Sequence, residues 1–279
     1  MVFNDLVFFQ DPEKRVLWDW SRAPFWVTAA QLQQVKDANP SVMFPKLNQN
    51  NRQGFGDFGR AGDYLYVSPR EANADISFLS EPGTGRQSGS VLFRYRSEQP
   101  APVQLNGKPW TTLPASKRVV EKTVFFENQE WGAANRLGFA PSPGLHLFDL
   151  EVQNWDAGQP GGVTYLSGWG NNEMPLGRPV FRWSYGPQSQ LRLTSPEGGR
   201  VRLSWKGQAP KAGARLGIWV AGRELARFSA LPTEVRPLQL DLDIRAGVTV
   251  VDFRYSQWGS DGDQRPLALS FEGLRLGWR

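Results

Sequence analysis

The feature that most constrains the fold of this chain is a pattern of twelve residues that occurs twice. Residues 144–155 read GLHLFDLEVQNW, and residues 247–258 read GVTVVDFRYSQW. Both segments begin with Gly, carry Asp at the sixth position and end with Trp, and apolar residues occupy matching positions between them. A pattern repeated about a hundred residues apart predicts two copies of one structural unit.

Three further blocks extend this match toward the N-terminus and keep their order. They pair 74–82 with 189–196, 89–100 with 199–210, and 103–113 with 218–228. Gly89 and Gly199 open one pair of blocks, and Gly107 and Gly222 mark the middle of another. The sequence therefore predicts a tandem duplication in which the first copy carries about twelve extra residues near 125–140.

Within each block, β-prone apolar residues alternate with polar residues, which is typical of half-buried strands. The residues expected to face the core are Thr249, Val251, Phe253 and Tyr255 in one copy, and His146, Phe148, Leu150 and Val152 in the other. Turn sequences such as Asn-Gly at 106–107 separate the strands. The pattern predicts an all-β chain made of two tandem jelly-roll-like β-sandwiches that arose by internal duplication.

The segment GWGNNEMPLGRP at 168–179 is polar and contains several glycines, a composition that favours a linker. We therefore expect module 1 to cover residues 60–175 and module 2 to cover residues 176–279. Each module would then be about the size of an ordinary sandwich domain.

Residues 1–58 do not alternate in this way and are predicted to form a separate N-terminal arm. Within this arm, VTAAQLQQVKDANP at 27–40 indicates one short helix. Thr28 is the expected N-cap with Gln31 three residues later, and Pro40 follows the expected end of the helix. The arm would pack on a module or connect to another part of a larger protein.

Composition and charge exclude several functional classes. No apolar run approaches the length that crosses a bilayer, and the N-terminal sequence lacks the basic region of a signal peptide. This leaves either a cytoplasmic protein or a piece of an extracytoplasmic one. The net charge of +5 comes mostly from dispersed Arg residues, whereas binding to nucleic acid requires clustered charge, so a nucleic-acid partner is disfavoured.

Candidate catalytic groups are few. The chain has one histidine, His146, and no cysteine, so a strand histidine that packs in the fold is favoured over a general base, and zinc sites are excluded. No phosphate-binding or dinucleotide-binding loop is present, and no cofactor is predicted. The pairs Asp149 with Glu151 and Asp241 with Asp243 could serve a glycosidase, although solvated side chains are the favoured interpretation. The sequence therefore favours a protein that is not an enzyme.

The loop SDGD at 260–263 offers weak candidates for a calcium site, Asp261 and Asp263. Calcium requires six to eight oxygen ligands, and two carboxylates are too few. A tight turn with solvated acids is therefore favoured, and no metal is predicted.

Tryptophans beside glycine and polar residues give the most informative functional signal. They occur in EWGAAN at 130–135, GWGNN at 168–172 and QWGSD at 257–261. A flat aromatic ring beside hydrogen-bonding side chains suits the recognition of a sugar ring. The candidate carbohydrate-binding residues are Trp131, Asn135, Trp169, Asn171, Asn172, Trp258 and Asp261. The alternative is that these tryptophans close the ends of the sandwiches, which is favoured for Trp155 and Trp258.

The second copy resembles a known group of modules through five of its segments. These segments are FRWSYGPQSQLRL, RVRLSWKG, RLGIWVAGREL, GVTVVDFRYSQW and RPLALSFEGLRL. They resemble the accessory β-sandwich modules found at the extracytoplasmic ends of polytopic membrane glycosyltransferases and related envelope proteins. The resemblance covers 180–279 well and 62–167 more loosely, and it includes no catalytic signature.

This resemblance implies a non-catalytic, extracytoplasmic accessory protein of the cell envelope with a carbohydrate-related binding role. Its expected partners are a glycan or cell-wall polysaccharide, and a membrane protein. The alternative function is a protein–protein interaction or scaffold module, in which the outward aromatic residues form a patch for another protein. A glycoside hydrolase and a nucleic-acid binder rank below both.

Overall fold

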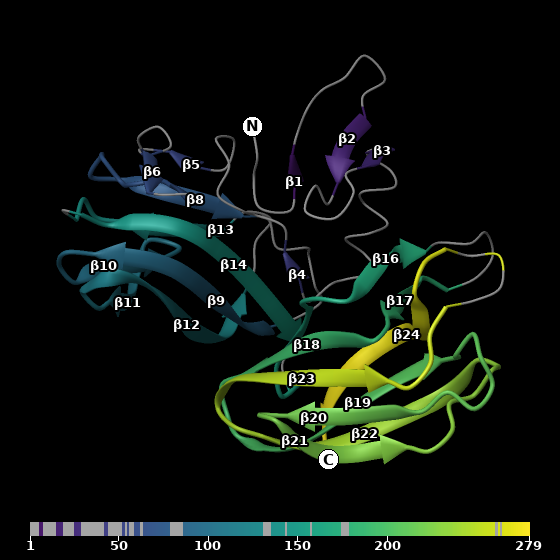
Figure 1. Cartoon of the computed structure of the whole chain (residues 1–279). Coiled ribbons are helices and arrows are strands. Elements are labelled where there is room, and N and C mark those ends of the chain that lie inside the picture. Colours follow the sequence, from purple (N-terminus) through teal and green to yellow (C-terminus); the bar gives the residue numbers. More distant parts are fainter. Residues whose placement is uncertain are drawn as a thin grey trace. The chain divides into compact units, whose positions relative to one another are not determined.

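All elements in the described part of the chain are β-strands (Figure 1). The computed structural model describes residues 6–7, 15–18, 25–28, 42–43, 52–53, 55, 59–61, 64–78, 86–130, 135–142, 144–156, 158–173, 179–259, 262 and 264–279. The predicted all-β fold is confirmed for these residues. Of the predicted helix at 27–40, residues 27–28 end strand β3 (Phe25–Thr28), and the rest lies outside the described residues.

The chain divides into two compact units, Met1–Ala157 and Gly158–Arg279, which we call unit 1 and unit 2. Each unit has its own hydrophobic core, formed by residues from both of its main sheets. Each is therefore a sandwich in its own right, as the duplication predicts.

Unit 1 contains two main antiparallel sheets and two smaller ones. The five-stranded sheet has the order β11 (Lys108–Leu113), β10 (Ala101–Leu105), β13 (Asn135–Phe139), β8 (Ala74–Phe78) and β5 (Arg52–Gln53). The four-stranded sheet has the order β12 (Ser116–Glu130), β9 (Arg86–Ser97), β14 (His146–Asp156) and β4 (Val42–Met43). The smaller sheets join β1 (Leu6–Val7), β2 (Arg15–Trp18) and β3, and pair β6 (Gly59–Ala61) with β7 (Tyr64–Tyr66).

Unit 2 consists of two five-stranded antiparallel sheets (Figure 1). The first has the order β15 (Gly162–Tyr165), β18 (Gln188–Ser195), β23 (Gly247–Tyr255), β20 (Leu216–Val220) and β21 (Arg223–Phe228). The second has the order β16 (Trp169–Glu173), β17 (Phe181–Tyr185), β24 (Leu267–Trp278), β19 (Gly199–Gly207) and β22 (Arg236–Ile244).

The strand pairing confirms the duplication. The strands from β8 to β14 pair with one another in the same pattern as the strands from β18 to β24. The hairpin turns between β10 and β11 and between β20 and β21 also match. Asn106 and Gly107 have φ values of 52° and 77°, and Ala221 and Gly222 have values of 47° and 78°. The sequence pairings 74–82, 89–100 and 103–113 with their second-copy counterparts agree with this pattern.

The fourth pairing, of 144–155 with 247–258, is wrong. Strand β14 lies in the four-stranded sheet and pairs with β9, whereas β23 lies in a five-stranded sheet between β18 and β20. The counterpart of β14 is β24, and the counterpart of β23 is β13. Both sheets of a sandwich have one buried face, so the same alternation occurs in either sheet and does not identify the sheet.

The boundary between the units also differs from the expected one at 175/176. Strands β15 and β16 pair with β18 and β17, so residues 162–173 belong to the sheets of unit 2. The expected linker at 168–179 therefore contains a strand, and the division falls within the Gly- and Pro-containing segment 157–162. Strands β4 and β5, placed in the N-terminal arm by the sequence, extend the two main sheets of unit 1.

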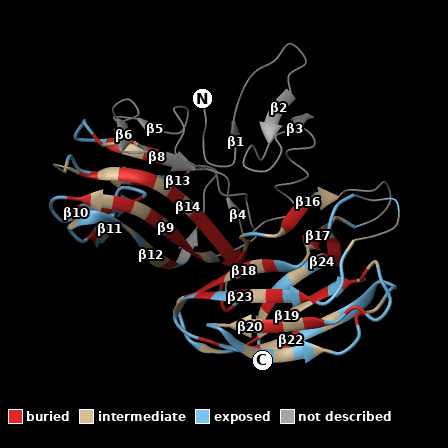
Figure 2. Ribbon diagram, in the orientation of Figure 1, coloured by how far each residue is buried: buried red, intermediate tan, exposed pale blue. Residues whose placement is uncertain are grey.

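Alternation along β23 follows the prediction. Thr249, Val251, Phe253 and Tyr255 are all buried, and the residues between them are exposed or half-buried (Figure 2). Strand β14 departs from it because its register with β9 shifts between Leu147 and Asp149. As a result, Leu147 and Phe148 are both buried and His146 is only half-buried.

Candidate functional site

The outward face of the β15–β18–β23–β20–β21 sheet carries an aligned row of polar and aromatic side chains. Gln190 on β18 is the register partner of Asp252 on β23, and Asp252 is the partner of Trp219 on β20. Register partners point to the same side of a sheet. Since Val251 and Phe253 beside Asp252 face the core, this row faces away from it. We call this surface the Trp219 face.

Hydrogen bonds fix the polar side of the Trp219 face. Asp252 Oδ1 accepts from Gln188 Nε2 at 3.0 Å and from Gln190 Nε2 at 2.7 Å. Gln190 Oε1 in turn accepts from Ser167 Oγ at 3.0 Å. The carboxylate thus holds two amide groups in place before any ligand arrives.

Trp219 is half-buried, and its neighbours hold its ring on the sheet. The Arg254 guanidinium carbon lies 4.2 Å from the ring centroid, within the range of a cation–π interaction. A side chain at Gly217 would begin 3.0 Å from the indole Nε1, so glycine leaves room for the ring there. The ring therefore has a defined orientation on the sheet surface.

The Trp219 face combines an aromatic ring with amides, a carboxylate and a guanidinium. Such a surface can stack on the C–H face of a ligand ring and exchange hydrogen bonds with hydroxyl groups. Two exposed apolar side chains lie farther along β23, Val250 with 37% and Val248 with 45% exposure. No candidate residue from the sequence belongs to this surface.

Trp169 is fully buried, with 0% exposure, so it has no face available to a ligand. Its ring lies 4.8 Å from those of Tyr165 and Phe271 and 6.2 Å from that of Phe253, and its Nε1 donates to the Gln190 carbonyl at 2.6 Å. The candidate assignment of Trp169 to a binding surface is therefore corrected to a core residue of unit 2.

The other candidates are dispersed. Asn135 is buried, and its Oδ1 accepts from Asn106 Nδ2 at 2.9 Å, so it supports the β10–β11 turn. Asn171 is exposed on edge strand β16, while Asn172 Oδ1 accepts from Arg182 Nε at 3.0 Å. Among the described residues, no hydrogen bond or ring contact joins these asparagines to the candidate tryptophans.

Trp258 is 39% exposed, and it packs on Gly186, where a side chain would overlap its ring. It is thus a second half-open aromatic ring in unit 2, whereas Trp155 is buried in unit 1 with 4% exposure. Trp131, Asp261 and Asp263 lie outside the described residues.

The sequence contains a signal for Trp219 that does not depend on a tryptophan–glycine motif. Leu216 and Ile218 are apolar residues two positions apart, so alternation places Trp219 on the opposite, outward side. An aromatic residue on the polar face of a strand is a stronger indication of a binding surface than a tryptophan beside glycine.

Of the carboxylate pair Asp241 and Asp243, Asp241 has a structural role. Asp241 accepts from Arg202 Nε at 2.7 Å and lies 3.0 Å from Arg279 Nη1. The hydrogen bond from Arg202 and the charges of both arginines lower the pKa of Asp241. A carboxylate held ionised in this way is poorly suited to donate a proton as a general acid.

Two searches of the described part of the chain were negative. No cluster of three or more His, Asp or Glu side chains within it could hold a metal ion. No helix in the same part is long and apolar enough to cross a membrane.

No family model matches this chain, and no curated protein matches it. Several solved structures are similar. The carbohydrate-binding module CBM6cm-2 of Cellvibrio mixtus lichenase 5A, in complex with cellotriose, has 11% identity and a TM-score of 0.29, and the match covers 42% of this chain and 90% of that one. The N-terminal CBM22-1–CBM22-2 tandem domain of Paenibacillus barcinonensis Xyn10C has 10% identity and a TM-score of 0.29, over 86% and 97% of the two chains.

The tandem CBM51 modules of a family 98 glycoside hydrolase from Streptococcus pneumoniae have 7% identity and a TM-score of 0.26, over 82% of this chain and 88% of that one. The assignment of the fold rests on the strand pairing, and the assignment of a site rests on the geometry of the Trp219 face.

Proposed function

We propose that this chain is a non-catalytic carbohydrate-binding protein, and that unit 2 binds a glycan across the Trp219 face. The observation that carries the proposal is the half-buried Trp219 ring in register with Asp252, whose carboxylate orients Gln188 and Gln190. Sugars present a flat C–H face and a rim of hydroxyl groups. A fixed aromatic ring beside fixed amide and carboxylate groups matches both features.

The expected ligand is a neutral or weakly charged polysaccharide that runs across strands β18, β23 and β20. Neighbouring strands lie ~4.8 Å apart, so the row from Gln190 to Trp219 extends over ~10 Å. An accessory role in the cell envelope and an extracytoplasmic location are part of this proposal. The association with membrane glycosyltransferases, which the sequence resemblance implies, stays a prediction.

Affinity electrophoresis of the whole chain tests the proposal. Gels would contain xylan, mixed-linkage β-glucan or glucomannan, and a gel without polysaccharide gives the reference mobility. We expect at least one polysaccharide to retard the wild type, and Trp219→Ala to abolish the retardation because it removes the stacking surface.

The matched control is Trp258→Ala, which removes another half-open tryptophan of unit 2 and should leave the retardation unchanged. Loss of retardation in Trp258→Ala but not in Trp219→Ala would move the site to the residues first indicated by the sequence. Absence of retardation of the wild type by every polysaccharide would contradict the proposed function.

The second candidate function is a protein-binding face, and the exposed Val248 and Val250 beside the polar row favour it. The double variant Val248→Thr with Val250→Thr separates the two. Both side chains lie beyond the Asp252 network along β23, so glycan retention should persist in this variant. Loss of retention would show that the apolar part of the face is needed and would count against sugar recognition by the polar row.

A further inference from the structure

Unit 1 contains a cavity of about 370 Å³ beside the end of strand β9. Arg96, Ser97 and Glu98 line it from β9 and the turn that follows, and Ser116 and Lys117 line it from the start of β12. Its size falls within the range of small-molecule sites in proteins. None of these residues belongs to the Trp219 face.

Irregular pairing on both sides of β9 shapes this cavity. Ser97 and Tyr95 on β9 are paired with Ser116 and Val120 on β12, so three residues of β12 lie opposite a single residue of β9. A second register shift lies on the other side of β9, in β14. Bulges of this kind redirect side chains, and they are frequent beside functional sites. Here one of the extra residues is Lys117.

The His146 ring lines the cavity and is stacked on a second aromatic ring. The His146 imidazole lies parallel to the Tyr66 ring, with the centroids 3.9 Å apart and an angle of 3° between the planes. Arg96 Nε donates to His146 Nδ1 at 2.9 Å. Burial and the Arg96 charge lower the pKa of His146, while Glu98 opposes them. The ring is therefore neutral at neutral pH and carries its proton on Nε2, as a hydrogen-bond donor.

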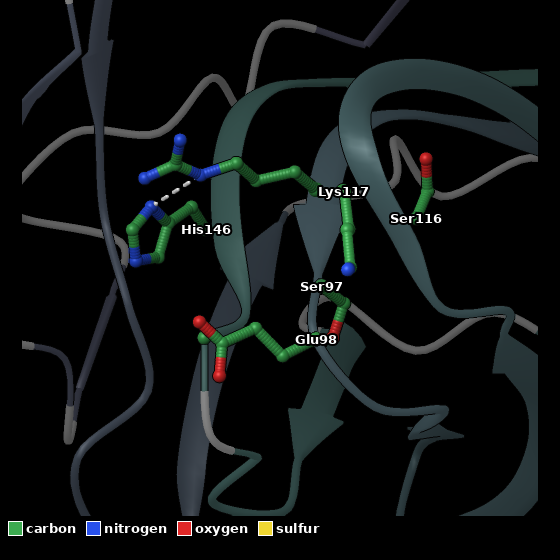
Figure 3. Close-up of a pocket in the computed structure, with 7 residues that line it drawn as sticks. Ser97, Glu98, Ser116, Lys117 and His146 are labelled. Atoms are coloured by element: carbon green, nitrogen blue, oxygen red, sulfur yellow. Dashed lines mark hydrogen bonds between the residues drawn. The ribbon is translucent and has the colours of Figure 1, made fainter.

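Two charged side chains face the same space, and neither has a hydrogen-bonded or ion-paired partner among the described residues. Figure 3 shows the Glu98 carboxylate, the Lys117 ammonium and the His146 ring around the cavity. The Glu98 side chain packs on Gly144, where an added side chain would overlap it. Within the described residues, neither the Glu98 nor the Lys117 side chain forms a hydrogen bond or an ion pair, and the Arg96 side chain forms no hydrogen bond beyond the one to His146.

The equivalent place in unit 2 differs. Lys206, which the repeat aligns with Arg96, forms an ion pair with Glu272 at 3.6 Å. The pairing of β19 with β22 runs without a register shift, so the bulge of β12 that carries Lys117 has no counterpart there, and only the pairing of β19 with β24 shifts, between Ser204 and Lys206. The unpaired charges and the bulge are therefore features of unit 1 and not of the repeated fold.

The charges define the chemistry of a ligand. Arg96 and Lys117 supply two positive charges and Glu98 one negative charge, which leaves a net charge of one positive unit. A ligand with a single carboxylate balances this charge, and the two free NH₂ groups of Arg96 suit a carboxylate geometrically. Glu98 repels a bare anion and needs a donor, which a hydroxyl group provides.

We propose that this cavity binds a hydroxylated carboxylate of the size of one sugar, a hexuronate. Its carboxylate lies on Arg96 and Lys117, and its hydroxyl groups donate to Glu98 and accept from His146 Nε2. This site is independent of glycan binding on the Trp219 face, since it lies in the other unit and recognises a different chemical group.

Titration calorimetry of the whole chain tests this site, with sodium D-glucuronate as the probe. D-glucose, acetate and inorganic phosphate are the comparison ligands, because each lacks either the carboxylate or the hydroxyl groups. We expect glucuronate to bind at least about tenfold more tightly than each of the three. Arg96→Met and Lys117→Glu should each weaken glucuronate binding by at least about tenfold.

Lys108→Met, which removes a positive charge from an exposed strand of unit 1, is the matched control and should bind like the wild type. Lys117 is exposed, so Lys117→Glu decides the question even if Arg96→Met fails to fold. The proposal is overturned if the wild type does not bind glucuronate, if phosphate or acetate binds as tightly, or if Lys117→Glu binds unchanged. Affinity electrophoresis of the Lys117→Glu variant in a gel with a neutral polysaccharide tests glycan binding by the Trp219 face separately from glucuronate binding in unit 1.

Discussion

Two equivalent hairpin turns differ in the residue that occupies a left-handed backbone position. Asn106 has φ of 52° and Ala221 has φ of 47°. Asn adopts this conformation readily, whereas the conformation is sterically unfavourable for Ala because its Cβ approaches the backbone. Asn106 also accepts from the Arg136 backbone amide and donates to Asn135, each at 2.9 Å.

We expect Ala221→Asn to raise the free energy of unfolding of unit 2 by about 0.5–1 kcal/mol, because it relieves this strain. Asn106→Ala should lower the free energy of unfolding of unit 1 by more than about 1 kcal/mol, since it adds strain and removes two hydrogen bonds. Urea unfolding of both variants measures the changes. Destabilisation by Ala221→Asn would show that the two turns are not equivalent.

The lowered pKa of His146 makes unit 1 sensitive to pH. Its ordinary value is 6.5. Below this pH the His146 ring of the unfolded chain takes up a proton more readily than the ring of the folded chain. The contribution of His146 to the free energy of unfolding is therefore fully present above pH 6.5, and it is lost as the pH falls through the lowered pKa of the folded state. The groups around the ring are Tyr66, Arg96, Glu98 and Lys117.

We expect the wild type to lose stability between about pH 7.5 and about pH 5, and His146→Gln to lose less over the same interval. Urea unfolding at both pH values gives the two differences. An equal loss in the variant would assign the pH dependence to other groups.

At the scale of strands, one glycine of the repeat is fixed by close packing. A side chain at Gly89 on central strand β9 would overlap the Gln153 carbonyl oxygen and the Phe126 ring. A side chain at Gly138 on β13 would lie 3.4 Å from Gln104, which is an ordinary contact distance. A side chain at position 89 could be accommodated only if the backbone of β14 moved.

We therefore expect Gly89→Ala to lower the free energy of unfolding by about 2 kcal/mol through overpacking. Gly138→Ala, the matched control, should change it by less than about 0.5 kcal/mol. Equal effects of the two substitutions in urea unfolding would argue against close packing as the reason why position 89 is occupied by glycine.

Alternation predicted the strands well, and it predicted their sheets less well. It identified the buried side of β23 and the hairpins around Gly107 and Gly222, because these depend on residues close in sequence. It assigned β14 and β23 to the same position in the repeat, because long-range pairing determines the sheet and leaves no local signal. For the same reason, no local pattern indicates that Arg96, Lys117 and His146 meet around one cavity.

At the scale of the whole molecule, the unit boundary has consequences for fragments of the chain. Residues 158–279 contain all the strands of both unit 2 sheets. A fragment that begins at residue 176 lacks β15 and β16, and with them the Trp169 ring at the centre of the core.

We expect residues 158–279 to fold alone, with a β-type circular dichroism spectrum and a cooperative thermal transition. Residues 176–279 should lack that transition, because loss of a buried Trp alone costs about 3–5 kcal/mol. Similar transitions in both fragments would contradict the assignment of β15 and β16 to unit 2.

The sequence predicted the kind of chemistry that we propose for the Trp219 face, but not the residues of that face. Aromatic rings beside polar groups indicated sugar recognition, but the residues chosen lie in the core, on separate surfaces or outside the described part of the chain. Trp169 shows why, because a tryptophan beside glycine is equally suited to fill a core. Exposure depends on the packing of both sheets, and the local sequence does not determine it.

Oxidative footprinting with a bound polysaccharide tests the central claim most directly, since it reports on each tryptophan separately by mass spectrometry. If the glycan lies across the Trp219 face, oxidation of Trp219 should slow several-fold on binding, while Trp258 and Trp278, which are 39% and 44% exposed, should react as before. Protection of Trp258 or Trp278 by a bound polysaccharide, with Trp219 still fully reactive, would contradict the account.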